Sequence, residues 1–146
     1  MPTAGKLAAA LAFMALGWAF SVILTPLYPD GMAPKYFVQV CLLVGLIVGW
    51  RIVGQHAGRG YNAATAQGLT GAGILLVWIL FFTSLMKMLR NSTRNVYDGP
   101  TDAVLNVAEL MFEQGRQFLH TEVAVAWVIG GLLAAFATEA MAQRYP

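Results

Sequence analysis

The residues whose chemistry could define a function are few, and they stand apart from one another in the sequence. The two histidines, His56 and His120, lie singly between apolar runs, without a second ligand at the spacing that a metal site requires. Cys41 lies inside an apolar run, where we expect a small buried side chain. No Ser–His–Asp, Cys–His or paired-carboxylate pattern is present. The sequence therefore predicts no catalytic residue and no metal ligand, which favours a protein that is not an enzyme.

The best candidate for a small-ligand contact is the glycine-rich, basic segment of residues 54–61. Arg51 precedes this segment, and Arg59 and Tyr61 lie within it. Its glycines and the backbone amides that enter the next helix could hold an anion such as a phosphate head group. An ordinary basic membrane anchor would explain the same residues. We therefore take Arg51, Arg59 and Tyr61 as candidate contacts to a lipid or an anion.

Two further pairs of residues are candidates for contacts with a partner or a hydrophobic molecule. Gly45 and Gly49 have the spacing that lets two membrane helices approach closely, so they either pack within the protein or dock a partner protein. Trp18 and Trp78 lie near the middle of apolar runs, whereas tryptophan favours the membrane interface. Their rings either pack in the core or face a lipid tail, a quinone, a carotenoid or another subunit.

The elements that must position these residues follow from the composition. Of the 146 residues, 58% are hydrophobic and 11% are charged, with a mean hydropathy of +0.63. A soluble domain has about 45–50% apolar and about 25% charged residues, so a soluble enzyme and a disordered tail are excluded. The apolar excess lies in four runs, residues 7–27, 36–53, 69–89 and 123–141, each close to the roughly 20 residues that cross a bilayer. We expect an all-α membrane protein whose residues 1–146 form a single four-helix transmembrane domain.

The segment between the third and fourth runs predicts a helix of a different kind. Residues 98–100, Asp-Gly-Pro, are typical of a helix start, with Pro100 in the first turn. Over residues 101–119, polar side chains recur every three to four positions among apolar ones, and most of the charged ones are acidic. This pattern predicts an amphipathic helix that lies on the membrane surface or caps the bundle.

Ionisable groups are nearly absent from the apolar runs. Glu139 is expected to reach the interface near Arg144, and no charged pair lies at mid-depth, which disfavours transport by this chain alone. No histidine lies inside a run, so we expect no haem or chlorophyll ligand and no cofactor, although a bound lipid, quinone or carotenoid is compatible with the sequence. Basic residues are nearly balanced between the two sides. The acidic helix would be repelled by an anionic leaflet, which favours cytoplasmic termini.

Several segments of the chain resemble the TrgA-type family of small membrane proteins. The likeness includes residues 1–7, 68–71, 97–100 and 138–139, and it covers nearly the whole chain at matching length and span number. Its most specific part is Gly49-Trp50-Arg51-x-x-Gly54-x-x-Ala57-Gly58-Arg59-Gly60-Tyr61. The resemblance implies an inner-membrane protein of purple-bacterial relatives that is associated with tellurite resistance. It implies no catalytic or binding residue and no mechanism.

Two functions remain open. The first is a non-enzymatic inner-membrane protein that acts by helix packing and by protein or lipid interaction, for which the resemblance implies a role in tellurite resistance. The second is an accessory or scaffold subunit of a larger membrane complex, such as a photosynthetic reaction-centre–light-harvesting core. We expect membrane lipids and other membrane-protein subunits as partners. A net charge of only +2 is too weak for a nucleic-acid platform.

Overall fold

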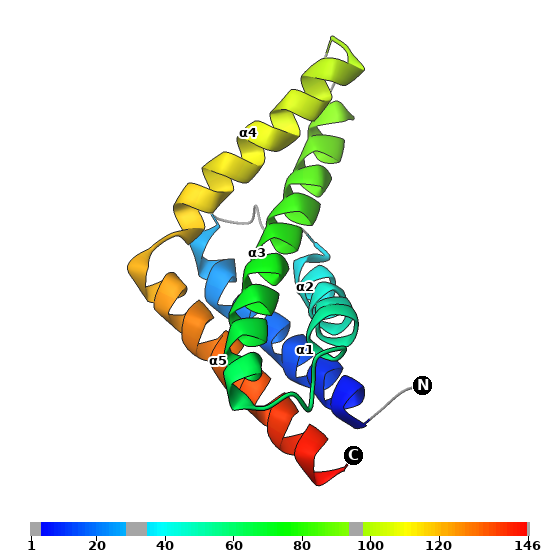
Figure 1. The fold of residues 1–146 in the computed structure, drawn as a ribbon. Coiled ribbons are helices and arrows are strands. Elements are labelled where there is room, and N and C mark those ends of the chain that lie inside the picture. The colour runs from blue at the N-terminus through cyan, green and yellow to red at the C-terminus, as the bar shows by residue number, and fades with distance from the viewer. Residues whose placement is uncertain (1–3, 29–34, 94–97, 146) are drawn as a thin grey trace.

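The computed structural model describes residues 4–28, 35–93 and 98–145, and it is built from helices (Figure 1). The first helix, α1, is Ala4–Leu24, and a short 3-10 turn, η1, extends it over Thr25–Leu27. Helix α2, Phe37–Val48, continues into a π-helical turn, η2, over Gly49–Val53. The long helix α3 is Tyr61–Ser92, α4 is Pro100–Phe118, and α5 is Thr121–Arg144. The described residues contain no strand, so the predicted all-α fold is confirmed.

Three helical stretches are long and apolar enough to cross a membrane: Ala4–Leu27, Tyr61–Ser92 and Thr121–Arg144. They contain the predicted runs 7–27, 69–89 and 123–141. A shorter apolar helix, Phe37–Val53, contains all but the first residue of the run 36–53. The third helix begins eight residues earlier than its apolar run, because the mildly polar residues 61–68 join it. Helix α4 matches the predicted amphipathic helix 101–119 to within one residue at each end.

Glycines on α1 and α2 bring the two helix backbones into direct contact. A Cβ atom at Gly45 would overlap the carbonyl oxygen of Phe13, and one at Gly49 would overlap that of Ala9. On the other side of the interface, a Cβ at Gly17 would overlap the carbonyl oxygen of Cys41. The paired positions descend on one helix as they rise on the other, so α1 and α2 are antiparallel. Gly45 and Gly49 therefore pack within the protein, against α1.

A second close interface joins α3 to α5. A Cβ atom at Gly68 would lie 2.6 Å from the carbonyl oxygen of Gly131, and one at Gly131 would lie 2.8 Å from the Cβ of Ala72. One turn further along, the indole Nε1–H of Trp127 donates a 2.8 Å hydrogen bond to the carbonyl oxygen of Ala72. The indole is 7% exposed, so this bond satisfies a polar group inside the bundle.

Helix α1 joins the two pairs. The Phe20 ring stacks on Trp127 of α5 with ring centroids 4.0 Å apart. A Cβ atom at Gly5 would contact Ala142 near the opposite end of α5. The start of α1 and the end of α5 consequently lie at the same end of the bundle (Figure 1).

Helix α4 packs along the upper part of α3, beyond the α3–α5 interface (Figure 1). It begins as predicted, with Gly99 extended before it and Pro100 in the first turn. Its buried face is formed by Val107, Leu110, Gln114 and Phe118. The apolar side chains that remain exposed are Val104, Leu105, Phe112 and Leu119, at 59–73% of their surface.

Candidate functional site

A groove of about 410 Å³ lies between α2 and α3. Its volume falls within the range of roughly 300–1,000 Å³ that is usual for small-molecule sites. One wall comes from α2 and η2, the other from α3, and Arg51 is the one charged residue in it. The lining residues are Val44, Ile47, Val48, Arg51, Ile52, Trp78 and Phe82.

The α2 wall of the groove is one face of a helix. Val44, Ile47, Val48 and Arg51 stand at positions i, i+3, i+4 and i+7, which lie on one side of a helix. The face that carries Gly45 and Gly49 is held against α1, so the α2 wall is directed away from that interface. Val44 and Val48 lie deep in the groove, whereas Ile47 is 56% exposed at its mouth. The α1–α2 contact thus sets which residues of α2 line the groove.

The α3 wall is aromatic. The rings of Trp78 and Phe82, one helical turn apart, are stacked with centroids 5.5 Å apart and an interplanar angle of 26°. Phe81 lies edge-on to both rings. Trp78 is 44% exposed, so its ring forms part of the rim of the groove.

Arg51 supplies a cation at one end of an otherwise apolar groove. It lies in the π-helical turn, where Gly54 N–H donates a 2.7 Å hydrogen bond to the Gly49 carbonyl oxygen. Single π-turns of this kind recur at functional sites. The guanidinium is exposed, and it has no hydrogen bond or ion pair with the part of the chain that the structure describes. Its donors are therefore free for an anion.

The amides of the 54–60 loop already have an anion, and it comes from the chain itself. Gly58 N–H and Gly60 N–H each donate a 2.8 Å hydrogen bond to the Glu139 carboxylate, one to each oxygen. Gln143 Nε2–H donates a third, at 3.0 Å. Both glycines have a left-handed φ, 90° and 98°, which side chains with a Cβ rarely adopt. Glu139 is 2% exposed and therefore buried under this loop.

The structure separates the candidate residues predicted from the sequence into those that line the groove and those that lie outside it. Arg51 and Trp78 are brought together in the groove. Arg59 and Tyr61 lie outside it: Arg59 is exposed between the two glycines, and Tyr61 packs edge-on to Phe136 of α5 at 6.0 Å.

Trp18 and Trp78 lie on the surface of the bundle, at 54% and 44% exposure, and the core-packing interpretation does not describe them. The indole that does pack in the core is Trp127, which sequence reasoning missed. The sequence did contain a signal of its burial, because Trp127 lies on the same face of α5 as the small residues Gly131, Ala135 and Thr138, which follow it at successive turns.

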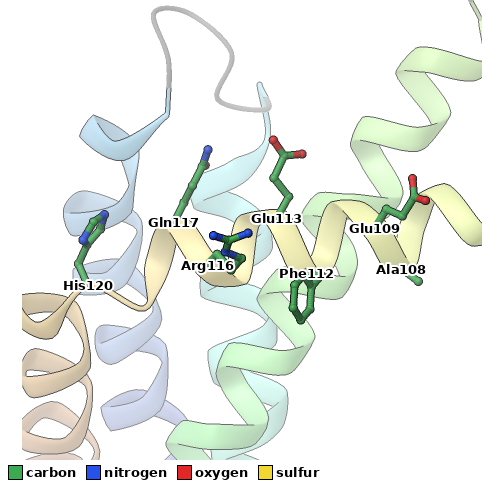
Figure 2. Close-up of a pocket in the computed structure, with 7 residues that line it drawn as sticks. All are labelled: Ala108, Glu109, Phe112, Glu113, Arg116, Gln117 and His120. Atoms are coloured by element: carbon green, nitrogen blue, oxygen red, sulfur yellow. The ribbon is translucent and has the colours of Figure 1, made fainter.

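A second hollow lies on the outer side of α4, lined by residues of α4 and His120 (Figure 2). Figure 2 shows Glu109 and Glu113 pointing to one side of the helix and Phe112 to the other. This arrangement is the surface of a single amphipathic helix rather than an enclosed site. Among the described residues, no three His, Cys, Asp or Glu side chains gather at one point.

Comparisons with protein families, with curated proteins and with solved structures find no match to this chain. The groove combines apolar walls with a single cation among its lining residues, Arg51.

Proposed function

We propose that this chain is a non-enzymatic integral membrane protein whose α2–α3 groove binds an anionic phospholipid. The observation that carries the proposal is the guanidinium of Arg51, which has no partner in the described part of the chain and lies at one end of an apolar, aromatic groove. The lipid phosphate binds Arg51, and an acyl chain lies along Val44 and Ile47 against the rings of Trp78 and Phe82. An arginine fork matches a phosphate group in shape as well as in charge.

The position of Arg51 along the bundle suits a head group. Gly49 lies against Ala9, and Gly54 lies against Lys6, so Arg51 is level with the first turns of α1. The α2 residues that would contact the acyl chain precede Arg51 in the sequence and lie towards the middle of the bundle. In the orientation that we propose, the cation lies near a bilayer surface and the apolar walls lie deeper, in the same order as the head group and the acyl chains of a phospholipid.

In the arrangement that we propose, α1, α2 with η2, α3 and α5 are four spans and α4 lies on the membrane surface. The 17 residues of Phe37–Val53 measure about 25 Å, less than the roughly 30 Å of hydrocarbon, so the bilayer thins or Arg51 reaches outward to meet the head groups. The antiparallel contact with α1 supports this fourth span. We further propose a bacterial inner membrane, with both termini in the cytoplasm.

Retention of lipid through purification tests the proposal. The protein is extracted in mild detergent, and bound phospholipid is measured by native mass spectrometry. In Arg51→Gln we expect about tenfold less bound anionic lipid, because a hydrogen bond to a charged group is worth about 1.5–3 kcal/mol and exposure places Arg51 at the lower end. Arg59→Gln is the matched control, since it removes an exposed arginine outside the groove, and it should retain the lipid.

A second variant separates the groove from the charge. Ile47→Trp fills the mouth of the groove and leaves Arg51 in place, so it should also reduce bound lipid. Equal losses in Arg51→Gln and Arg59→Gln, with none in Ile47→Trp, would show that lipid is held by general surface charge and would refute the groove.

For the physiological role, we propose that the protein supports tellurite resistance through its effect on the membrane, as the TrgA resemblance implies. Deleting the gene should lower tellurite tolerance, and a copy that carries Arg51→Gln should fail to restore it where Arg59→Gln succeeds. Unchanged tolerance in the deletion strain would remove this role.

The alternative function, an accessory subunit of a larger membrane complex such as a photosynthetic core, is favoured by one observation. Trp18 is 54% exposed on a face of α1 that also exposes Leu11 and Val22. Exposed tryptophan at the centre of an apolar face is typical of protein interfaces. Purification in gentle detergent tests this function, since a subunit migrates with its complex and a lone protein does not.

A further inference from the structure

Three side chains bring buried polar atoms together where the chain after η1, the upper part of α3 and α4 meet. They are Tyr28, Thr83 and Gln114. Tyr28 is half-buried, and its buried polar atom is the phenol oxygen. Thr83 and Gln114 are each 1% exposed, and Gln114 lies on the face of α4 that is otherwise apolar. Ser84, beside Thr83 on α3, is a further fully buried hydroxyl. A cluster of this kind inside an apolar helix interface must satisfy its hydrogen bonds internally.

The protein groups alone do not satisfy this cluster. Thr83 Oγ1 is 2.7 Å from the Ile79 carbonyl oxygen and 3.0 Å from Gln114 Oε1, but it has a single proton to donate. Gln114 Nε2 has no partner among the described residues, and the Tyr28 phenol, although close enough to Thr83 to interact with it, makes no hydrogen bond of standard geometry there. Turning the amide of Gln114 over would let it donate to Thr83, but its oxygen would then be left without a donor. Either orientation leaves one end of the amide unpaired.

The Tyr28 phenol is held where it is by aromatic neighbours. Its ring lies edge-on to Phe37 at 5.3 Å and to Phe118 at 5.7 Å, so it cannot swing to another partner without losing these contacts. Burial raises the pKa of Tyr28 to about 12, and the nearby Thr83 hydroxyl offsets only part of that shift. At neutral pH the phenol is protonated, and it can both donate and accept a hydrogen bond.

We propose that this cluster is a binding site for an internal water molecule, which bridges the Tyr28 phenol and the free end of the Gln114 amide. A water molecule both donates and accepts, so it completes the cluster in either orientation of the amide. The bridge ties α4 to the end of α1 and to α3 through polar contacts. Gln114 therefore adds a directional polar contact to the apolar face of α4 and so helps to set the orientation of this helix against the bundle.

Substitutions that keep the shape of a side chain but remove its polarity test the proposal, because a dry cluster and a hydrated one predict opposite changes in the melting temperature. If the cluster is dry, Tyr28→Phe removes an unpaired polar atom, and Gln114→Met removes an unpaired amide nitrogen while the Thr83 hydroxyl keeps its hydrogen bond to the Ile79 carbonyl oxygen, so the melting temperature stays the same or rises. If water bridges the two, each variant leaves the remaining groups unpaired, and the melting temperature falls by roughly 2–4 °C or more. Thr138→Val is the matched control, because that buried hydroxyl bonds only to the Ala134 carbonyl of its own helix.

The double variant and a direct observation complete the test. When both residues share one water, the second substitution lowers the melting temperature less than it does alone, so the effects are not additive. The side-chain amide protons of Gln114 should also give a nuclear Overhauser signal to water in the detergent-solubilised protein. Single variants that melt at or above the wild-type temperature, together with an absent water signal, would overturn the proposal.

Discussion

Replacing Glu139 with glutamine should release the 54–60 loop from the bundle. The carboxylate accepts one 2.8 Å hydrogen bond on each oxygen from Gly58 and Gly60. A glutamine side chain has almost the same shape, but it offers one accepting oxygen and one N–H₂ group. One glycine N–H would then face another donor, and the remaining bond would lose the charge of its acceptor.

The magnitude follows from these two losses. A hydrogen bond to a charged group contributes about 1.5–3 kcal/mol, and a buried donor left unpaired costs about 1–3 kcal/mol. Glu139 is buried beneath the loop but lies near the end of the bundle, where solvent screens part of the charge, so we expect a total of about 2–4 kcal/mol. For a chain of this length, that lowers the melting temperature by roughly 4–16 °C.

Two assays report on this change. Circular dichroism in detergent gives the melting temperature, and limited trypsin digestion reports on the loop itself, because Arg59 lies exposed between the two glycines. Glu139→Gln should melt earlier and be cut faster after Arg59. Glu113→Gln, an exposed carboxylate on α4, is the control and should change the free energy of unfolding by less than about 0.5 kcal/mol. Wild-type melting and wild-type cleavage in Glu139→Gln would refute the role of the carboxylate.

Three further substitutions test other parts of the fold. Gly49→Val should destabilise the protein by more than about 2 kcal/mol in thermal unfolding, because the valine side chain meets the α1 backbone. Gly73→Ala, with open space around its Cβ, should be neutral or should stabilise the protein by up to about 1 kcal/mol in the same assay. Trp127→Phe keeps a ring but loses the bond to Ala72, and urea titration should show a loss of about 0.5–1.5 kcal/mol; no change would contradict a stabilising role for that bond. Phe112→Trp adds a tryptophan on the exposed side of α4, and lipids brominated near the head group should quench its fluorescence. If these lipids leave its emission unchanged, α4 lies away from the membrane surface.

Much of the helical architecture could be predicted from the sequence. The apolar runs contain enough residues to mark the long helices, and Pro100 with its preceding glycine marks the start of α4. The glycine pair of α2 predicted a close helix contact and makes one. These features are local, so the sequence specifies them without knowledge of which helix lies beside which.

The faces of the helices could not be predicted, and the reason is physical. A membrane span is apolar all round, so its sequence does not distinguish the side that meets protein from the side that meets lipid. Trp18 and Trp78 therefore carried no sign that they would be exposed. Gln114 is a different case, because it lies on the amphipathic helix α4: its position on the face of Val107, Leu110 and Phe118 indicates burial, whereas its polarity does not. Glu139 finds its partners about 80 residues away, at Gly58 and Gly60, a pairing that only the fold creates.

The groove and the tight helix contacts have a common origin. Gly45 and Gly49 draw α2 against α1, and Gly68 with Gly131 draws α3 against α5. Helices α2 and α3 thus each have their closest backbone contact with another helix, and they meet one another through side chains, among them Val53 against Gly71, beside which the groove lies. Large side chains, Trp78 and Phe82, line the groove without filling it. The small residues thus do more than stabilise the bundle: by deciding which helices touch, they leave Arg51 beside an apolar groove, the site at which we propose that an anionic phospholipid binds.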